Sequence, residues 1–274
     1  MKYMHLNSSC PYAGLANMLM LQGHDTEDFK IALAIDLPSH IRYDSESGAF
    51  LSGFSLQSKK WFDLYLNPIG FTYIEQFWAK EELPKRLLPG MMLGLFIAPE
   101  QKHAVICSHA DETHSVFINN KWAHTGEPET FRFTGAELQS RLPDTVAVGW
   151  LQSSAPQSVD FEHDYKESLE TWLLLQEALH KFMSYRQSAS AMRKQLNPLF
   201  RPLLLDGLTM AQLRGEKELT AELTTLQKTL LNVLRQNTPA RLADHMDMGS
   251  LDRSIQLIMQ HGTDAADKLL KNAR

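Results

Sequence analysis

One cysteine stands where the sequence pattern predicts the start of a helix. Cys10 follows Ser8 and Ser9, either of which could cap a helix, and Pro11 fits a first helical turn. Apolar residues then recur at helical spacing as far as Gly23, a typical helix end. A thiol at a helix N-terminus lies near the positive end of the helix dipole, which favours a nucleophilic thiolate. The alternative is that Cys10 is a small buried apolar residue, as many free cysteines are.

A cysteine nucleophile needs a base within hydrogen-bond reach. Among the eleven histidines, His103 begins an expected strand at 103–108, directly after a loop, so its side chain could reach the helix that carries Cys10. His109 and His114 lie at the far end of that strand, beside the expected turn. We therefore expect His103 to be the base.

The imidazole of such a pair needs a third group that fixes its orientation. The strand that His103 begins and a second one at 114–118 predict an antiparallel hairpin, which returns the chain to His103 at Asn119 and Asn120. A side-chain amide oxygen there can accept the imidazole N–H. We expect Asn120 to be this orienter and Asn119 to be the alternative, because neighbouring strand residues face opposite ways. Trp122 could shield the bond from water, whereas a plain turn is the other interpretation of this polar run.

The elements that must position these residues predict an α+β domain. Helical patterns come first, and strand patterns follow at 71–74, 91–98, 103–108, 114–118 and 145–151. A helix followed by a mostly antiparallel sheet is typical of this class. Residues 36–53 are rich in Ser, Gly and Asp and predict an irregular loop that could form a lid or a wall of the site. Thr134 and Glu137 have the spacing of a capping box before a short helix.

The character of the chain changes after the last expected strand. Residues 152–160 are rich in Ser, Pro and Gln and predict a linker. Beyond it, leucines at helical intervals predict an all-α bundle, with helices at 167–183, 203–213, 218–234, 250–259 and 263–271. We therefore expect two domains, at 1–151 and 160–274. The helical domain could cover the sheet, close the active site or form a homo-oligomer.

Composition excludes several classes of protein. Hydrophobic residues make up 43% and charged residues 22% of the 274, and the net charge is −5, which does not favour binding to nucleic acid. No apolar run reaches the roughly 18 residues that cross a bilayer, and no signal-peptide cleavage site is evident, so we expect no membrane partner. Two cysteines, Cys10 and Cys107, make no disulfide framework, which fits the cytoplasm, although one bridge between them would weaken the nucleophile hypothesis. Cys107 and His109 lack a metal-ligand spacing, so we expect neither a metal nor a cofactor.

Taken in order, these residues resemble a papain-like cysteine peptidase. The sequence is similar to the double-glycine peptidase-like group, which cleaves bacteriocin leaders, and to the N-terminal domain of the butirosin-biosynthesis acyltransferase family. The resemblance covers about residues 1–150. It is carried by Ser9-Cys10 and the helix after it, the strand at 90–97, His103-Ala104-Val105-Ile106, Asn119-Asn120 and the capped helix at 134–138. It implies a papain-like fold of a bacterial enzyme with Cys10, His103 and Asn120 as its triad.

The resemblance also has a departure. The peptidase group places a Gln six residues before the cysteine as an oxyanion-hole donor, and Met4 occupies that position here. Asn7 or His5 could replace it, with the Cys10 backbone N–H as the second donor. Asn120-Lys121-Trp122 is similar to the Asn-x-Trp run of papain-like enzymes. Met4 therefore argues more against proteolysis than against other acyl chemistry.

The leading hypothesis from sequence is a thiol-dependent acyl-transfer enzyme, an acyltransferase or a thioesterase. Its substrate would be an acyl-thioester, on a small molecule or a carrier protein. The alternative within enzymes is a cysteine peptidase that acts on a peptide leader. The alternative outside enzymes is a non-catalytic binding module of the same fold, which the loss of an oxyanion donor would favour.

Overall fold

The computed structural model describes the chain except for residues 1, 7–9, 99–100, 120–128, 158–161 and 273–274. Its contacts divide the chain into two compact units. Unit 1 comprises Met1–Ala34 and Gln57–Val159, and unit 2 comprises Ile35–Leu56 and Asp160–Arg274. The division therefore differs from the expected single boundary at the linker, because an early segment of the chain belongs with the late helices.

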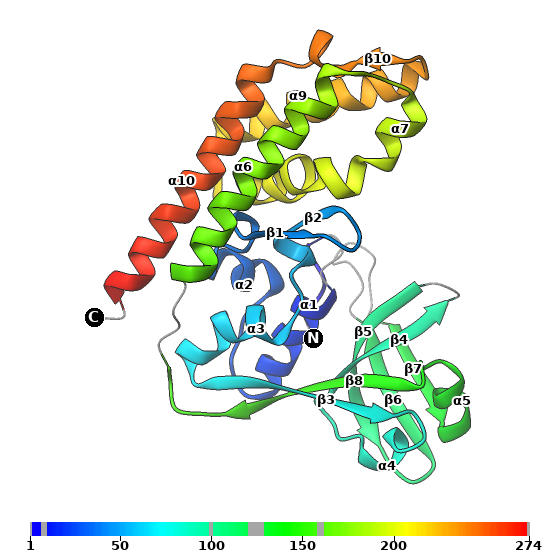
Figure 1. Cartoon of the computed structure of the whole chain (residues 1–274). Coiled ribbons are helices and arrows are strands. Elements are labelled where there is room, and N and C mark those ends of the chain that lie inside the picture. Colours follow the sequence, from blue (N-terminus) through cyan, green and yellow to red (C-terminus); the bar gives the residue numbers. More distant parts are fainter. Residues whose placement is uncertain (1, 7–9, 99–100, 120–128, 158–161, 273–274) are drawn as a thin grey trace. The chain divides into compact units, whose positions relative to one another are not determined.

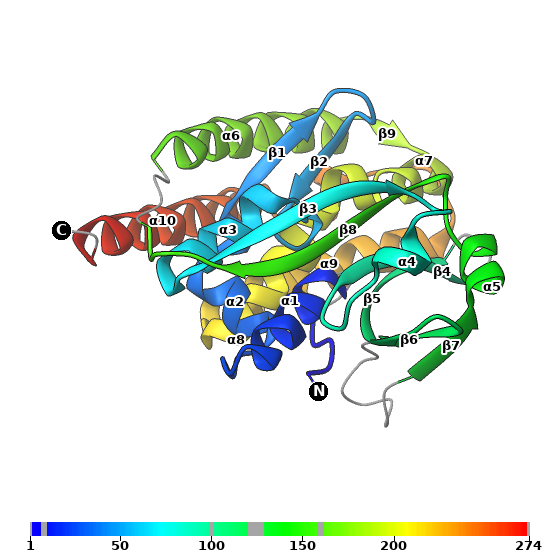
Figure 2. The same ribbon diagram turned by 90° about the horizontal axis from the view of Figure 1, so that it is seen from below.

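A six-stranded sheet forms the centre of unit 1. Its strand order is β3-β8-β4-β5-β6-β7, and every neighbouring pair is antiparallel. The long strands β3 and β8 run side by side in both views (Figure 1 and Figure 2). The expected α+β class is confirmed for this unit. The strands are β3 (Phe71–Ala79), β4 (Met92–Ala98), β5 (Gln101–Ala110), β6 (His114–Asn119), β7 (Glu129–Thr134) and β8 (Thr145–Ser153).

The helices of unit 1 begin and end at residues that the sequence indicates. Gly23, with a φ of 84°, follows the first helix, and the side chains of Thr134 and Glu137 form the expected capping box of the last. Both predictions are confirmed. The helices are α1 (Cys10–Leu21), α2 (Asp28–Ala34), α3 (Lys59–Leu66), α4 (Leu83–Arg86) and α5 (Gly135–Ser140).

Helix α1 packs closely against the sheet. Its residues from Tyr12 to Leu19 are all buried. A Cβ atom placed on Gly14 would lie 2.4 Å from Sδ of Met92 and 3.5 Å from Cδ1 of Ile106, so the side chain of Met92 packs directly against this glycine. The missing side chain at this position brings the start of α1 near β5.

The other face of the sheet is a hydrophobic core. On β5 and β6, Cys107 lies opposite Phe117 in the register, and Val105 lies opposite Asn119. Val105, Cys107 and Phe117 are all fully buried in this core, together with Leu93 and Val148 of the neighbouring strands. Alternation places Ile106, which approaches Gly14 of α1, on the opposite face from Val105 and Cys107. His103 shares the face of Val105, and near the start of β5 it lines the same cavity as Cys10.

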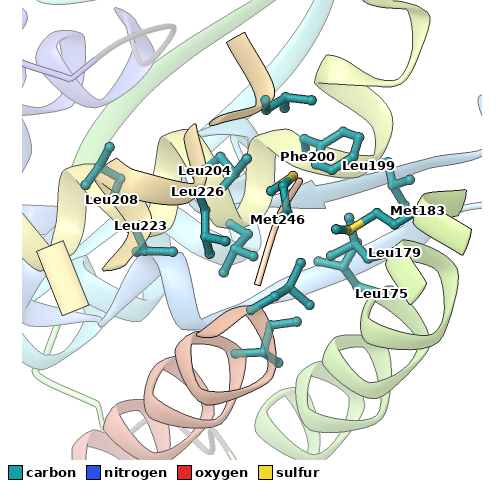
Figure 3. Packing of buried hydrophobic residues seen from close by; sticks show 14 of the residues in the cluster. Leu175, Leu179, Met183, Leu199, Phe200, Leu204, Leu208, Leu223, Leu226 and Met246 are labelled. Atoms are coloured by element: carbon teal, nitrogen blue, oxygen red, sulfur yellow. The ribbon is translucent and has the colours of Figure 1, made fainter. Parts of the chain in front are cut away.

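Unit 2 is helical and has a core of its own. Leu175, Leu179 and Met183 come from one helix and meet Leu223 and Leu226 of another in a single buried cluster (Figure 3). Two expected helices near the C-terminus form one continuous helix. Two π-helical segments also occur. The elements are α6 (Glu162–Ser184), β9 (Arg186–Gln187), α7 (Ala189–Lys194), the π-helices η5 (Leu196–Phe200) and η6 (Pro202–Gly207), α8 (Leu208–Arg214), α9 (Lys217–Gln236), β10 (Ala240–Arg241), η7 (Leu242–Asp244) and α10 (Met248–Asn272).

The expectation of an irregular loop at 36–53 is wrong, because this segment is ordered within unit 2. It contains η1 (Leu37–Ser39), the hairpin strands β1 (Ile41–Asp44) and β2 (Ala49–Ser52), and η2 (Gly53–Ser55). The indole N–H of Trp172 donates to the carbonyl of Ser39 at 2.9 Å, and both residues are buried. The hydroxyl of Ser52 donates to the carboxylate of Asp206 at 3.0 Å. Hydrogen bonds over such sequence distances hold the segment among the late helices.

The helices that the structure describes include none that is both long enough and apolar enough to span a membrane.

The indole hydrogen bond allows a test of this arrangement. We expect Trp172→Phe to lower the free energy of unfolding by about 1–3 kcal/mol, because the buried Ser39 carbonyl loses its donor. Leu173→Ala, at the exposed neighbouring position, should change it by less than about 0.5 kcal/mol. Urea unfolding followed by circular dichroism measures both. Equal effects of the two substitutions would contradict the assignment of the early segment to unit 2.

Candidate active site

Cys10 is the first residue of α1, as expected from the sequence, and its thiol lies next to strand β5. Its Sγ accepts a hydrogen bond from the backbone N–H of Ala104 at 3.4 Å. Ala104 directly follows His103 in the sequence, so the backbone N–H that contacts the thiol belongs to the residue next to the expected base. Cys10 is partly exposed, and both cysteines are free thiols.

A second polar residue fixes the start of α1. The side chain of Asn17 is buried inside α1, and its Nδ2 donates to the carbonyls of Ala13 and Lys2 at 2.9 Å each. Its Oδ1 accepts the backbone N–H of Lys2 at 2.7 Å. The N-terminal segment is thereby tied to the helix that carries the thiol.

Cys10 and His103 both line one cavity of about 300 Å³ in unit 1. Three polar residues of the wall, Gln57, Glu75 and Lys102, carry an amide and one charge of each sign. The rest of the wall is mostly apolar and aromatic: Pro11, Phe62, Tyr73, Met92, Leu93, Gly94, Ala104 and Ala147. The cavity can therefore hold a mixed polar and apolar group beside the thiol. A Cβ on Gly94 would lie 2.3 Å from Cε of Lys102, so the lysine chain lies across this glycine.

Burial sets the protonation of the pair. It raises the pKa of the Cys10 thiol above the usual value, and the hydrogen bond from Ala104 only partly offsets this. It lowers the pKa of His103, and the negative charge of Glu129 acts in the opposite direction. The direction for Cys10 is opposite to the depression expected from the helix dipole. Burial favours the neutral form of each group, a thiol and an imidazole.

Asn119 is the expected alternative orienter, and the structure describes it. It is buried and lies opposite Val105 on β5, two residues from His103, so Asn119 and His103 are diagonal neighbours on one face. Such neighbours are about 7–8 Å apart, within reach of long side chains. The Nδ2 of Asn119 donates to Oε2 of Glu129 at 3.3 Å, and its buried Oδ1 accepts no hydrogen bond from the described residues. The first choice, Asn120, lies outside the described residues.

The other expected site residues lie away from the cavity wall or outside the described residues. His5 does not line the cavity: its backbone N–H and its Nδ1 both contact the carboxylate of the buried Asp28, at 2.7 and 3.1 Å. Asn7, the other oxyanion candidate, and Trp122 lie outside the described residues. Met4 is buried and lies outside the cavity wall.

Gln57 is the cavity residue that sequence reasoning missed. It stands before α3, far along the chain from Cys10, and nothing in its neighbourhood forms a motif. Its side-chain amide supplies two donors. Only the fold brings it to the same cavity as the thiol. The described residues contain no group of three or more His, Cys, Asp and Glu side chains that could hold a metal ion.

Neither a protein-family model nor a curated protein matches the chain. Among solved structures, it is similar to the peptidase domain of ComA from Streptococcus, a bifunctional ABC transporter involved in a quorum-sensing pathway. The match has 11% sequence identity and a TM-score of 0.37, and it covers 57% of this chain and 96% of the ComA domain. Similarity at this level does not establish a shared fold, so the functional proposal below depends on the cavity itself.

The two thiols differ in burial, which predicts different reactivity. Cys107 is fully buried and burial raises its pKa to about 11, whereas Cys10 is partly exposed. We expect iodoacetamide to label Cys10 much faster than Cys107 in the folded protein, as measured by mass mapping. Because the pKa of Cys10 is raised, its labelling rate should still be increasing above about pH 8.5, where a free thiol is half ionised. Equal rates for the two thiols would contradict the site, and a Cys10 rate that levels off below pH 8 would contradict the neutral thiol.

Proposed function

We propose that the chain is a cysteine hydrolase that cleaves a peptide bond, with Cys10 as the nucleophile and His103 as the general base. The observation that carries this proposal is the hydrogen bond from the Ala104 N–H to the Cys10 Sγ, within a cavity that His103 also lines. A buried structural cysteine would have no reason to border a cavity with both charges and an imidazole. A nucleophile needs this arrangement.

The neutral pair supports a reaction that begins with proton transfer. His103 takes the thiol proton as Cys10 Sγ forms a bond to the substrate carbonyl carbon, and the carbonyl oxygen takes the negative charge. The carbon–nitrogen bond then breaks as the imidazolium returns the proton to the leaving amine. Water, deprotonated by His103, hydrolyses the resulting thioester and restores the thiol.

A peptide substrate would use His103 twice. Its leaving amine needs a proton, which the imidazolium formed in the first step can return. A thioester leaving group needs little such help. Acyl transfer to an amine or from a carrier protein, the preference from sequence, would use the same first step. No contact of the described residues supports an acceptor other than water, so hydrolysis of a peptide is the simpler proposal.

Asn119 is proposed as the residue that positions His103. Three features support it: its place on the same face as His103, its burial, and a buried Oδ1 that accepts no bond from the described residues. A buried acceptor without a donor is costly, and a functional partner is one explanation for it. Its Nδ2 is bonded to Glu129, which leaves the Oδ1 as the atom that would accept the imidazole N–H.

Gln57 is proposed as a donor to the developing oxyanion. Its amide lies in the cavity wall with the thiol, and the Cys10 backbone N–H at the start of α1 would be the second donor. This pair would fill the role that Met4 cannot perform. Preorganised donors of this kind act only when the charge develops.

Three variants test the proposed roles. We expect Cys10→Ala to abolish cleavage of peptides and His103→Ala to lower kcat/KM by about 10²–10⁴. Asn119→Ala should have an intermediate effect, because it removes the proposed acceptor oxygen but no reacting group. A library of quenched fluorescent peptides, with a double-glycine peptide and an acyl-thioester included, provides the assay. Intact mass measures the acyl group on Cys10.

His109→Ala is the matched control for the base. His109 lies on the same strand, with its exposed ring bonded to Asp111, and it should leave kcat/KM unchanged. Acylation that survives His103→Ala but fails with His109→Ala would contradict the assigned base. If the parent protein acylates Cys10 from neither peptide nor thioester, the proposed function is wrong and a binding module replaces it.

A further inference from the structure

Unit 2 contains a cavity of about 510 Å³ that the proposed hydrolase does not use. Residues of helix α6, of the hairpin formed by β1 and β2, and of the π-helix η5 line it. Its volume lies within the range of about 300–1,000 Å³ that is usual for small-molecule sites. The hairpin that sequence analysis expected to be a loop therefore forms one wall of a ligand-sized space.

The walls of this cavity are apolar. Phe50, Ala178, Phe182 and Leu199 line it from three different elements. Phe50 is buried and stacks at a tilt against the ring of Tyr43, with the ring centroids 4.9 Å apart. Rings held in this way form a fixed surface against which an apolar chain could pack without ordering new side chains.

The rim of the cavity exposes large apolar side chains to water. Tyr43, Leu174 and Tyr185 all line it and are 51%, 52% and 58% exposed. Each would lose contact with water on binding an apolar ligand, at about 25 cal/mol for each Å² that is buried. Apolar side chains gathered around a cavity are typical of a binding site.

The charge of the lining residues indicates the sign of the charge on the ligand. Lys181 is the one charged residue in it, and the other strongly polar side chains are the amides of Gln187 and Gln195. No carboxylate contributes to the described wall. An ammonium group with nearby amide donors favours an anion, and an apolar cavity beside them favours a chain attached to that anion.

The backbone of η5 is also unusual. Gln195 and Leu199, which contribute to the lining, stand at the start and near the end of this π-helical segment, Leu196–Phe200, which contains Pro198. π-helical turns are rare and occur frequently at functional sites. This observation is independent of the cavity and points to the same place.

We propose that this cavity binds a small amphipathic carboxylate of the fatty-acid type. Its hydrocarbon chain lies between Phe50, Ala178 and Phe182, and its carboxylate lies at the rim near the ammonium group of Lys181. The site is separate from the cavity of Cys10, and the proposal does not depend on the proposed hydrolase.

A fluorescent fatty acid tests the site in the full chain. Dansylaminoundecanoate should bind saturably with a stoichiometry of one, and decanoate should displace it. Because an exposed ion pair contributes little, decanoate should compete at a concentration about two- to fivefold lower than decanol. Failure of the probe to bind saturably would overturn the proposal.

Neighbouring residues on α6 provide a matched pair of variants. Leu173 and Leu174 are 51% and 52% exposed, but only Leu174 lines the cavity. Leu174→Glu should weaken probe binding at least about tenfold, because it removes apolar surface and places a negative charge at the rim. Leu173→Glu should change it less than about twofold. Thermal unfolding of each variant checks that the fold is retained, which exposure of both positions favours.

The role of the cation has its own control. Lys181→Gln should weaken the binding of decanoate about two- to fivefold and leave the binding of decanol unchanged. Lys228 is an exposed lysine of α9 outside the cavity wall, and Lys228→Gln should have no effect on either ligand.

Equal effects of Leu173→Glu and Leu174→Glu would show that the probe binds elsewhere and would overturn the site. Binding of decanol as tight as that of decanoate, unchanged by Lys181→Gln, would overturn the carboxylate.

Discussion

The contact on which the candidate site depends is the hydrogen bond from the Ala104 N–H to the Cys10 thiol. It joins the first residue of α1 to the strand that carries His103. Close packing makes this possible, because Gly14 lets α1 approach Met92 and Ile106 of the sheet. The buried amide of Asn17 then fixes the N-terminal segment to the same helix. A shift of α1 would separate the proposed nucleophile from the proposed base.

Burial influences the pKa values of Cys10 and His103 more strongly than the helix dipole does. A helix N-terminus stabilises a negative charge by about 0.3–1 kcal/mol, less than one pKa unit, whereas burial can shift a pKa by several units. Desolvation is accordingly the largest influence on both Cys10 and His103, and it favours the neutral form of each. Glu129 partly opposes this at His103, so it links the protonation of the base to the amide of Asn119. The proposed catalytic pair would therefore meet a substrate as a thiol and an imidazole.

Local patterns predicted much of unit 1 because they depend on neighbours in the sequence. The start of α1 at Cys10, its end at Gly23 and the capping box of Thr134 and Glu137 all follow from short-range hydrogen bonds and backbone preferences. The pairing of the strand that carries His103 with β6 follows from alternation and a turn, although β5 begins at Gln101, two residues before the expected start at His103. Residues that come to the cavity from distant parts of the sequence were harder to predict. Gln57 reaches the cavity only through the tertiary fold, and the face that Asn119 shares with Val105 follows from the strand register.

The expectation of a loop at 36–53 was wrong for the same reason. The Ser, Gly and Asp residues of this segment are typical of a loop, yet its order comes from partners far along the chain, such as Trp172 and Asp206. The π-helices next to it have no sequence signature either. A pattern that is read locally cannot show that hairpin and helices together enclose a cavity.

The pKa of His103, followed through its ring signals by NMR, tests the resting state of the pair most directly. The account predicts a value below about 6.5, lowered further by Glu129→Gln because that change removes the charge that raises it. Alkylation of Cys10 should shift the His103 signals, because the two side chains line one cavity. A His103 that titrates above 7, as in a thiolate–imidazolium pair, or one that is indifferent to alkylation of Cys10, would contradict the account.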